Sequence, residues 1–228
     1  MPNSLLYDPS HHRLSDSTVD DLVARGTVVR LRKGQHLFRE ADRGDQVFLV
    51  RSGQIKVALT TPTGRELLLA LKLPGDLVGE LSAIDGDVRS AAATATEAST
   101  LVTVSASQFL GSLEREPKLA LALLRQLSRQ IRVAGQRSAD RVSADTKTRL
   151  AHRLIELSST IGLYDAAGDA TTLHLTQDDL AGWIGATREA TARALAELRS
   201  ASCVSTARQR VTITNIGTLT TIASGASG

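Results

Sequence analysis

Two charged residues stand among small ones in the stretch GELSAIDGDVRSAAA, residues 79–93. Glu80 and Arg89 lie nine positions apart, and Gly79 and Ser90 are among the small residues beside them. Such neighbours leave room for another molecule to approach both side chains. An arginine can hold an anion through a charge-assisted fork of hydrogen bonds, whereas a carboxylate accepts hydrogen bonds from hydroxyl groups. The pattern indicates a binding site, and the alternative is a plain salt bridge between Glu80 and Arg89 across a turn.

A second group of charged residues falls on one side of a helix predicted over residues 188–199. At 100° per residue, Arg188, Glu189 and Arg193 share one arc with Ala192, and the opposite side is apolar or small. Arginine can donate two hydrogen bonds to guanine, and glutamate can accept one from cytosine. This arc predicts direct reading of DNA in the major groove. The alternative is an ordinary amphipathic surface helix with salt bridges.

The residues before that helix follow a helix-turn-helix pattern. Thr176 can cap a first helix, Gly185 can end it, and Thr187 can cap the second helix, which starts at Arg188. Two helices joined by so tight a turn are typical of DNA-binding proteins.

A basic turn follows the second helix. The segment VSTARQRVTIT, residues 204–214, predicts two short strands that form a wing. Arg208 and Arg210 in this wing are suited to phosphates, contacts that set the position of a protein on DNA without reading sequence.

Glycines divide the first half of the chain at nearly regular intervals. They are Gly34, Gly44, Gly53, Gly64, Gly75 and Gly86, separated by 10, 9, 11, 11 and 11 positions. Segments of alternating polarity lie between them, for example residues 54–60, where Ile55, Val57 and Leu59 alternate with other residues. We therefore predict a small antiparallel barrel or roll over residues 27–105, in which residues 79–93 are strand and turn. A helix around residues 16–26 should precede it and end at Gly26.

The period changes after Pro117 and predicts a long helix. Its apolar or small positions alternate at spacings of three and four: Leu124, Leu127, Ile131, Ala134 and Ser138. So narrow a seam suits a partner helix in a homodimer, and the alternative is packing on the protein's own roll. The helix should break at residues 143–146, where Asp145 can cap the next one.

Composition restricts the classes of protein. The 228 residues carry a formal net charge of +3 and one cysteine, Cys203, so a disulfide framework is excluded. No membrane span is expected, because the most apolar stretch is interrupted by Lys72, Pro74 and Asp76. No signal peptide is expected, because the N-terminus lacks a basic start followed by an apolar run. We expect a cytoplasmic protein. The five histidines show no HxH or HxxxH spacing in the predicted roll, which argues against a metal-dependent barrel enzyme.

The order of roll, long helix and winged helix-turn-helix resembles the cyclic-AMP receptor and fumarate-nitrate regulator (Crp/Fnr) family of bacterial transcription factors. Two motifs carry the resemblance: GDLVGELSAIDGDVRSAA is similar to the family's phosphate-binding cassette, and LTQDDLAGWIGATREATARALAEL to its DNA-reading unit. The resemblance implies that the backbone of Gly79, Glu80 and Leu81 approaches a cyclic nucleotide. It also implies that Glu80 accepts a hydrogen bond from the ribose 2′-hydroxyl and that Arg89 and Ser90 hold the cyclic phosphate.

The same resemblance assigns the DNA contacts. Arg188, Glu189 and Arg193 fall where relatives that read a GTGA-type half-site carry Arg, Glu and Arg. The expected DNA contacts are Thr187, Arg188, Glu189, Arg193, Arg208 and Arg210. One departure concerns the ligand: Ala134 and Gly135 replace the Thr-Ser pair that meets the adenine in cyclic-AMP receptors.

We therefore expect an α+β protein with a β-roll sensor domain over residues 1–116, a dimerisation helix and hinge over 117–144, and a winged helix-turn-helix domain over 145–228. It is expected to be a homodimeric transcription regulator, not an enzyme, whose affinity for palindromic GTGA-type sites is modulated by a cyclic nucleotide, cAMP, bound in the roll. The alternative is a ligand-independent Crp/Fnr-type regulator with a vestigial nucleotide pocket. The expected partners are double-stranded DNA, a second copy of the chain and RNA polymerase, with no membrane, metal, haem or Fe–S cluster.

Overall fold

A computed structural model describes residues 23–62, 64, 66–161, 171–173 and 175–225 of the chain. The chain divides into two compact units, and the boundary between them falls after Arg129, within the long helix α4 (Pro117–Ser143). Each unit is described by itself.

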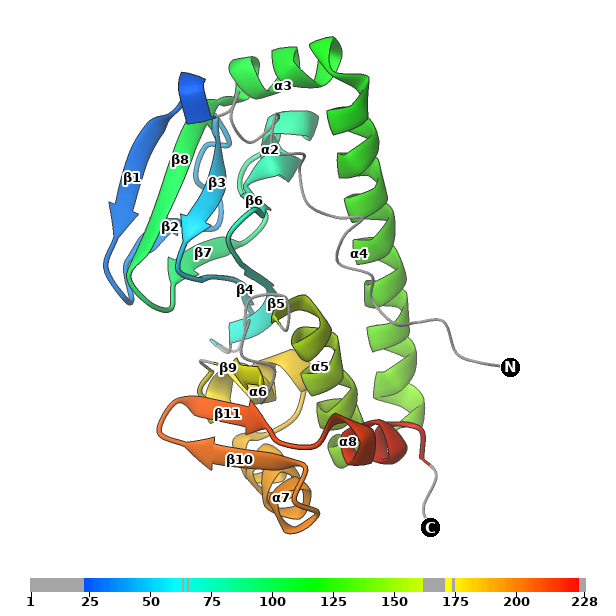
Figure 1. Ribbon diagram of the computed structural model, residues 1–228. Coiled ribbons are helices and arrows are strands. Elements are labelled where there is room, and N and C mark those ends of the chain that lie inside the picture. The colour runs from blue at the N-terminus through cyan, green and yellow to red at the C-terminus, as the bar shows by residue number, and fades with distance from the viewer. Residues whose placement is uncertain (1–22, 63, 65, 162–170, 174, 226–228) are drawn as a thin grey trace. The chain divides into compact units, whose positions relative to one another are not determined.

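The first unit is an antiparallel roll, as predicted (Figure 1). Its described strands form two four-stranded sheets, one in the order β1-β8-β3-β6 and the other in the order β2-β7-β4-β5, and every pairing is antiparallel. The strands are β1 (Thr27–Leu31), β2 (His36–Phe38), β3 (Gln46–Ser52), β4 (Ile55–Thr60), β5 (Glu66–Lys72), β6 (Leu77–Val78), β7 (Ala92–Ala95) and β8 (Ser99–Ser105). Residues 23–25 are helical and the helix ends at Gly26, as predicted, while the earlier part of that predicted helix lies outside the described residues.

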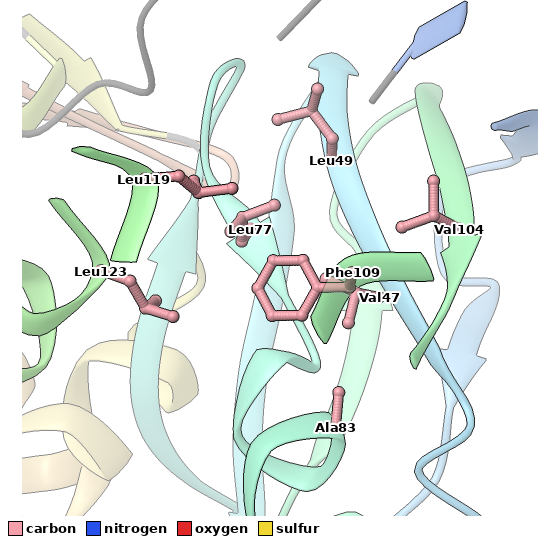
Figure 2. Close-up of a cluster of buried hydrophobic side chains, with 8 residues drawn as sticks. All are labelled: Val47, Leu49, Leu77, Ala83, Val104, Phe109, Leu119 and Leu123. Carbon is pink, nitrogen blue, oxygen red and sulfur yellow. The ribbon is translucent and has the colours of Figure 1, made fainter. Parts of the chain in front are cut away.

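Apolar side chains from strands and helices form a core around Phe109. This residue lies on α3 (Ala106–Arg115), and its ring is fully buried. Figure 2 shows the cluster, in which Leu119 and Leu123 enter from α4 and Val47 and Leu77 from the strands. The start of α4 is therefore anchored to the roll of its own chain, in agreement with the alternative considered for this helix.

Further along α4, large apolar side chains stay in contact with solvent. Leu124 is 59% exposed and Ile131 is 73% exposed, and both belong to the predicted seam. Leu127 packs partly against the core of the roll. The long helix itself is confirmed, and the pairing of its seam with a second copy stays a prediction.

Two local expectations for the roll were wrong. Residues 80–85, expected as strand and turn, form the short helix α2 (Glu80–Asp85), which begins after Gly79 and ends at Gly86, both in left-handed conformation. Six residues are too few for a helical period to show in the sequence. In β4 the alternation fails because a bulge after Val57 shifts the register, so that Ala58 is buried where alternation predicts exposure.

The second unit is a winged helix-turn-helix, and it contains all the helices that the sequence predicted after Asp145. Helix α5 (Thr146–Ile161) begins after Asp145, whose carboxylate accepts a hydrogen bond from the Thr148 amide at 2.7 Å. The pair α6 (Gln177–Ile184) and α7 (Arg188–Ser200) is joined by a tight turn at Gly185, in left-handed conformation.

The wing of the second unit has more elements than the sequence indicated. Strands β10 (Val204–Ala207) and β11 (Arg210–Ile213) form the predicted hairpin beside α7 (Figure 1). A third strand, β9 (Thr171–Leu173), pairs with β11, and a last helix, α8 (Ile216–Ala223), packs on α5. Neither was predicted; for β9 the reason is that a three-residue strand carries almost no periodic signal.

Candidate functional sites

Arg89 is a buried cation without a carboxylate partner among the described residues. Only 3% of the residue is exposed. Its Nη1 donates to the Gly79 carbonyl at 2.7 Å and its Nη2 to the Gln46 carbonyl at 2.6 Å, while the guanidinium lies 4.3 Å from the centre of the Phe38 ring. Its Nε is buried without a hydrogen-bond partner among the described residues. Burial lowers the pKa of Arg89, and the nearby charges of Asp45, Glu80 and Asp42 oppose that effect.

Glu80 is also buried, at 4% exposed, and it pairs with a residue that the sequence analysis did not select. Its Oε1 lies 3.5 Å from Nζ of Lys72, the last residue of β5. The alternative of a Glu80–Arg89 salt bridge is therefore wrong. A lysine within an otherwise apolar segment was the signal that could have pointed to Lys72.

Gly79 brings the backbone close to Arg89. Its φ of 81° is the left-handed conformation that favours glycine, and a Cβ at this position would lie 2.5 Å from Nη1 of Arg89. The structure thus brings Gly79, Glu80 and Arg89 together. Leu81 and Ser90, the other two predicted ligand contacts, are exposed next to them.

The buried charges of the roll do not balance. Among the described residues of the first unit, the buried charged side chains are Lys72, Glu80 and Arg89, which sum to one positive charge. Burying a charge is costly unless it is compensated. A ligand with a single negative charge would supply the missing compensation.

In the second unit, α7 presents the predicted charged arc to solvent. Arg188, Glu189 and Arg193 are exposed, whereas Ala194 and Leu198 on the other side are buried. The hydroxyl of Thr187 accepts a hydrogen bond from the Ala190 amide at 3.1 Å and so caps the helix. The predicted arrangement of polar and apolar sides is confirmed, and the arc is exposed to solvent.

Local contacts position two members of this arc. Arg188 forms an ion pair with Asp178 of α6 at 3.6 Å, which the sequence analysis did not foresee. A hydrogen bond from its own backbone N–H lowers the pKa of Glu189, and the Thr187 side chain adds to this effect. Glu189 is therefore ionised at neutral pH and can act as a hydrogen-bond acceptor.

The wing presents its two arginines to solvent. Arg208 lies in the turn between β10 and β11, Arg210 begins β11, and both are exposed. Cys203 is buried where α7 meets the wing, with its Sγ 3.1 Å from the Leu198 carbonyl oxygen, and burial raises the pKa of its thiol. A buried thiol of this kind is a packing residue.

Comparisons with known proteins agree with both halves of this description. Residues 28–116 match the cyclic nucleotide-binding domain, and residues 148–222 match the Crp-like helix-turn-helix domain. The "CRP-like cAMP-activated global transcriptional regulator" of Mycobacterium tuberculosis is 30% identical over 181 residues, which are 79% of this chain and 81% of that protein. The chain belongs to the Crp/Fnr family of transcription regulators. Its predicted family and α+β fold are thereby confirmed.

Some Crp/Fnr relatives of this chain have names that do not mention cAMP. The "Transcriptional activator protein anr" of Pseudomonas aeruginosa is 27% identical over 208 residues, which are 91% of this chain and 84% of that protein. Among solved structures, FixK2 from Bradyrhizobium japonicum has a TM-score of 0.73 at 22% identity, covering 86% of this chain and 96% of its own. This last likeness concerns the fold.

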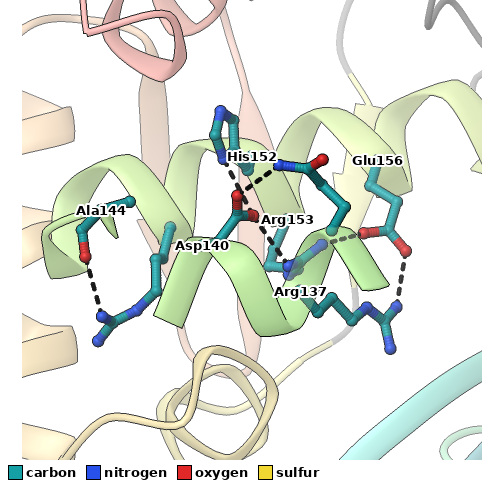
Figure 3. A network of polar contacts seen from close by, with 8 residues as sticks. Arg137, Asp140, Ala144, His152, Arg153 and Glu156 are labelled. Atoms are coloured by element: carbon teal, nitrogen blue, oxygen red, sulfur yellow. Dashed lines mark hydrogen bonds and ion pairs between the residues drawn. The ribbon is translucent and has the colours of Figure 1, made fainter. Parts of the chain in front are cut away.

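A network of charged side chains joins the end of α4 to α5 in this Crp/Fnr regulator (Figure 3). Asp140 accepts from Arg153 at 3.1 Å and lies 3.2 Å from Nδ1 of His152. Glu156 accepts one hydrogen bond from Arg153 and one from Arg137, each at 2.6 Å. Because Asp140 and Arg153 are buried, the network holds the last turns of α4 on the DNA-binding unit.

The part of the chain that the structure describes contains no group of three or more His, Cys, Asp or Glu side chains placed to hold a metal ion. No helix within it is long and apolar enough to cross a membrane.

Proposed function

We propose that this protein is a homodimeric transcription regulator whose affinity for palindromic GTGA-type DNA sites is increased by cAMP bound in the β-roll. In this proposal, residues 1–116 form the sensor, residues 117–144 the dimerisation helix and hinge, and residues 145–228 the DNA-binding domain. The observation that carries the proposal is the buried Arg89 cation, which has no carboxylate partner among the described residues and lies against Gly79. The cytoplasm, where cAMP and the chromosome meet in bacteria, is its proposed location.

The cassette geometry suits a cyclic phosphate. A guanidinium has five N–H donors, and the Gly79 and Gln46 carbonyls accept two of those of Arg89, which leaves three for phosphate oxygens. Ser90, which is exposed beside Arg89, would add a hydroxyl donor. Glu80 would accept the ribose 2′-hydroxyl, and the single negative charge of cAMP would compensate the excess positive charge of the roll.

The dimer would form through α4. Leu121, Leu124 and Ile131 are large apolar residues that this helix exposes, and a partner helix would remove them from water. A two-fold axis would then present two α7 helices to half-sites about 34 Å apart, one turn of DNA. A ligand acts as a switch only if it binds the DNA-competent arrangement more tightly than the other.

On DNA, each exposed residue has a chemical role. Arg188 and Arg193 would donate to guanine and Glu189 would accept from cytosine. Thr187 at the helix start and the wing residues Arg208 and Arg210 would contact phosphates. RNA polymerase is proposed as the partner of the DNA-bound dimer.

The test is fluorescence anisotropy of a labelled palindromic GTGA-type duplex, titrated with protein with and without saturating cAMP at one salt concentration. We expect cAMP to tighten binding at least about tenfold, equivalent to about 1.4 kcal/mol of coupling. Arg89→Ala should abolish this response, whereas Arg51→Ala, a matched change at an exposed arginine of β3, should keep it. A response that survives in Arg89→Ala would refute the role of the cassette.

A second candidate is a regulator that needs no ligand. Two observations favour it: Ala134 and Gly135 stand where cyclic-AMP receptors carry hydroxyls, and Arg89 already has two carbonyl partners. This candidate predicts specific, tight DNA binding that is the same with and without cAMP in the anisotropy experiment.

A further inference from the structure

Lys72 is a buried lysine whose ammonium faces the candidate ligand site. Only 7% of the Lys72 surface is exposed, and a lysine is almost never buried unless its charge is paired. The Nζ of Lys72 lies 3.5 Å from Oε1 of Glu80. Among the described residues, this contact is the only ion pair or hydrogen bond of the Glu80 side chain. Two desolvated charges at this separation constrain each other's position strongly.

Lys72 contacts only one of the two carboxylate oxygens of Glu80, Oε1. Lys72 ends β5, whereas Glu80 begins α2, directly after the glycine whose carbonyl accepts from Arg89. A carboxylate has about four acceptor positions on its two oxygens. Lys72 lies at Oε1, and Oε2 is left with acceptor capacity for a ligand hydroxyl.

We propose that Lys72 is a positioning residue of the effector site: it holds Oε1 of Glu80 in place so that Oε2 accepts the ribose 2′-hydroxyl. The inference rests on the proposed binding of cAMP and goes further, because it assigns the hydroxyl selectivity of the site to a residue that need not touch the ligand. Without Lys72, the Glu80 carboxylate would have no cation at Oε1 to hold it and would turn to another rotamer.

The test compares cAMP with 2′-deoxy-cAMP, because only cAMP carries the hydroxyl that Glu80 would bind. Calorimetric titration of the full chain with each nucleotide gives the ratio of their dissociation constants. A hydrogen bond to a charged acceptor predicts about a 10- to 100-fold preference of the natural protein for cAMP. Lys72→Met, which keeps an unbranched chain of nearly the same length and removes the charge, should reduce this preference to less than about threefold.

Three further variants separate positioning from general stability. Lys72→Arg keeps a cation and should retain most of the preference. Lys56→Met makes the same chemical change on the neighbouring strand β4, where the lysine pairs with Glu66, and should leave the preference intact. In a Glu80→Gln background, adding Lys72→Met should change the preference no further, because a residue that acts through Glu80 has nothing left to position.

Thermal unfolding of each variant checks that it is folded, and Lys72→Gln replaces Lys72→Met if the latter does not fold. An unchanged preference in the folded Lys72 variants would overturn the inference while leaving cAMP binding in place. Equal affinity of the natural protein for both nucleotides would also overturn it, because Glu80 would then not bind the hydroxyl. Absence of binding by either nucleotide would refute the proposed function and this inference together.

Discussion

Replacement of Asp140 by alanine tests how the end of the long helix is held on the DNA-binding unit. The buried Asp140 carboxylate accepts hydrogen bonds from Arg153 at 3.1 Å and from Gln136 at 2.8 Å, and it lies 3.2 Å from His152. Alanine removes all three contacts at once. It leaves the Arg153 guanidinium buried with one carboxylate partner, Glu156, instead of two (Figure 3).

The magnitude follows from the burial of the pair. Breaking a buried ion pair by removing one partner costs about 3 to 5 kcal/mol. Because Arg153 keeps Glu156 at 2.6 Å, we expect a loss at the lower end, about 3 kcal/mol. With a urea slope of about 1.5 kcal/mol per M, the unfolding midpoint should fall by about 2 M.

The assay uses the single tryptophan of the chain. Trp183 is buried in α6 of the second unit, so its fluorescence during urea unfolding reports on that unit. The control is Lys147→Ala, which breaks the exposed pair of Lys147 with Glu197 at 3.3 Å. An exposed pair contributes about 0.5 kcal/mol, so the control should shift the midpoint by about 0.3 M.

A second variant separates charge from packing. Asp140→Leu combined with Arg153→Met replaces the ion pair by apolar side chains, and such replacements are often neutral or stabilising. We expect this double variant to recover most of the stability lost in Asp140→Ala. If Asp140→Ala shifts the midpoint no more than the Lys147→Ala control does, the network does not stabilise the unit and the reasoning is refuted.

Two further predictions concern the proposed ligand site and the proposed DNA-binding face. Gly79→Ala should weaken cAMP binding at least about tenfold in calorimetry, because its Cβ would displace the Arg89 guanidinium. The control is Gly34→Ala, at a glycine with nearly the same positive φ and open space around it; this variant should lose about 1 kcal/mol of stability and keep its affinity for cAMP. Asp178→Asn removes the carboxylate that pairs with Arg188. If Arg188 contacts DNA as proposed, anisotropy should show binding about two- to fivefold tighter at low salt, and unchanged affinity would contradict that contact.

The sequence by itself determined the features that depend on neighbouring residues. The caps at Thr176 and Thr187, the turn at Gly185 and the long period after Pro117 each rest on contacts within a few positions, and the structure has all of them. Helical and strand periods, capping hydroxyls and left-handed glycines act locally, so they are visible in a linear pattern.

Tertiary structure alone decided how the charged residues are paired. Glu80 pairs with Lys72 across two elements instead of with Arg89, and Arg89 reaches the Gln46 carbonyl, which is 43 positions away in the chain. Which of several buried charges meet depends on strand register, on bulges such as the one after Val57, and on the balance between desolvation and attraction. These are properties of the folded arrangement, and a pattern of residue types along the chain does not contain them.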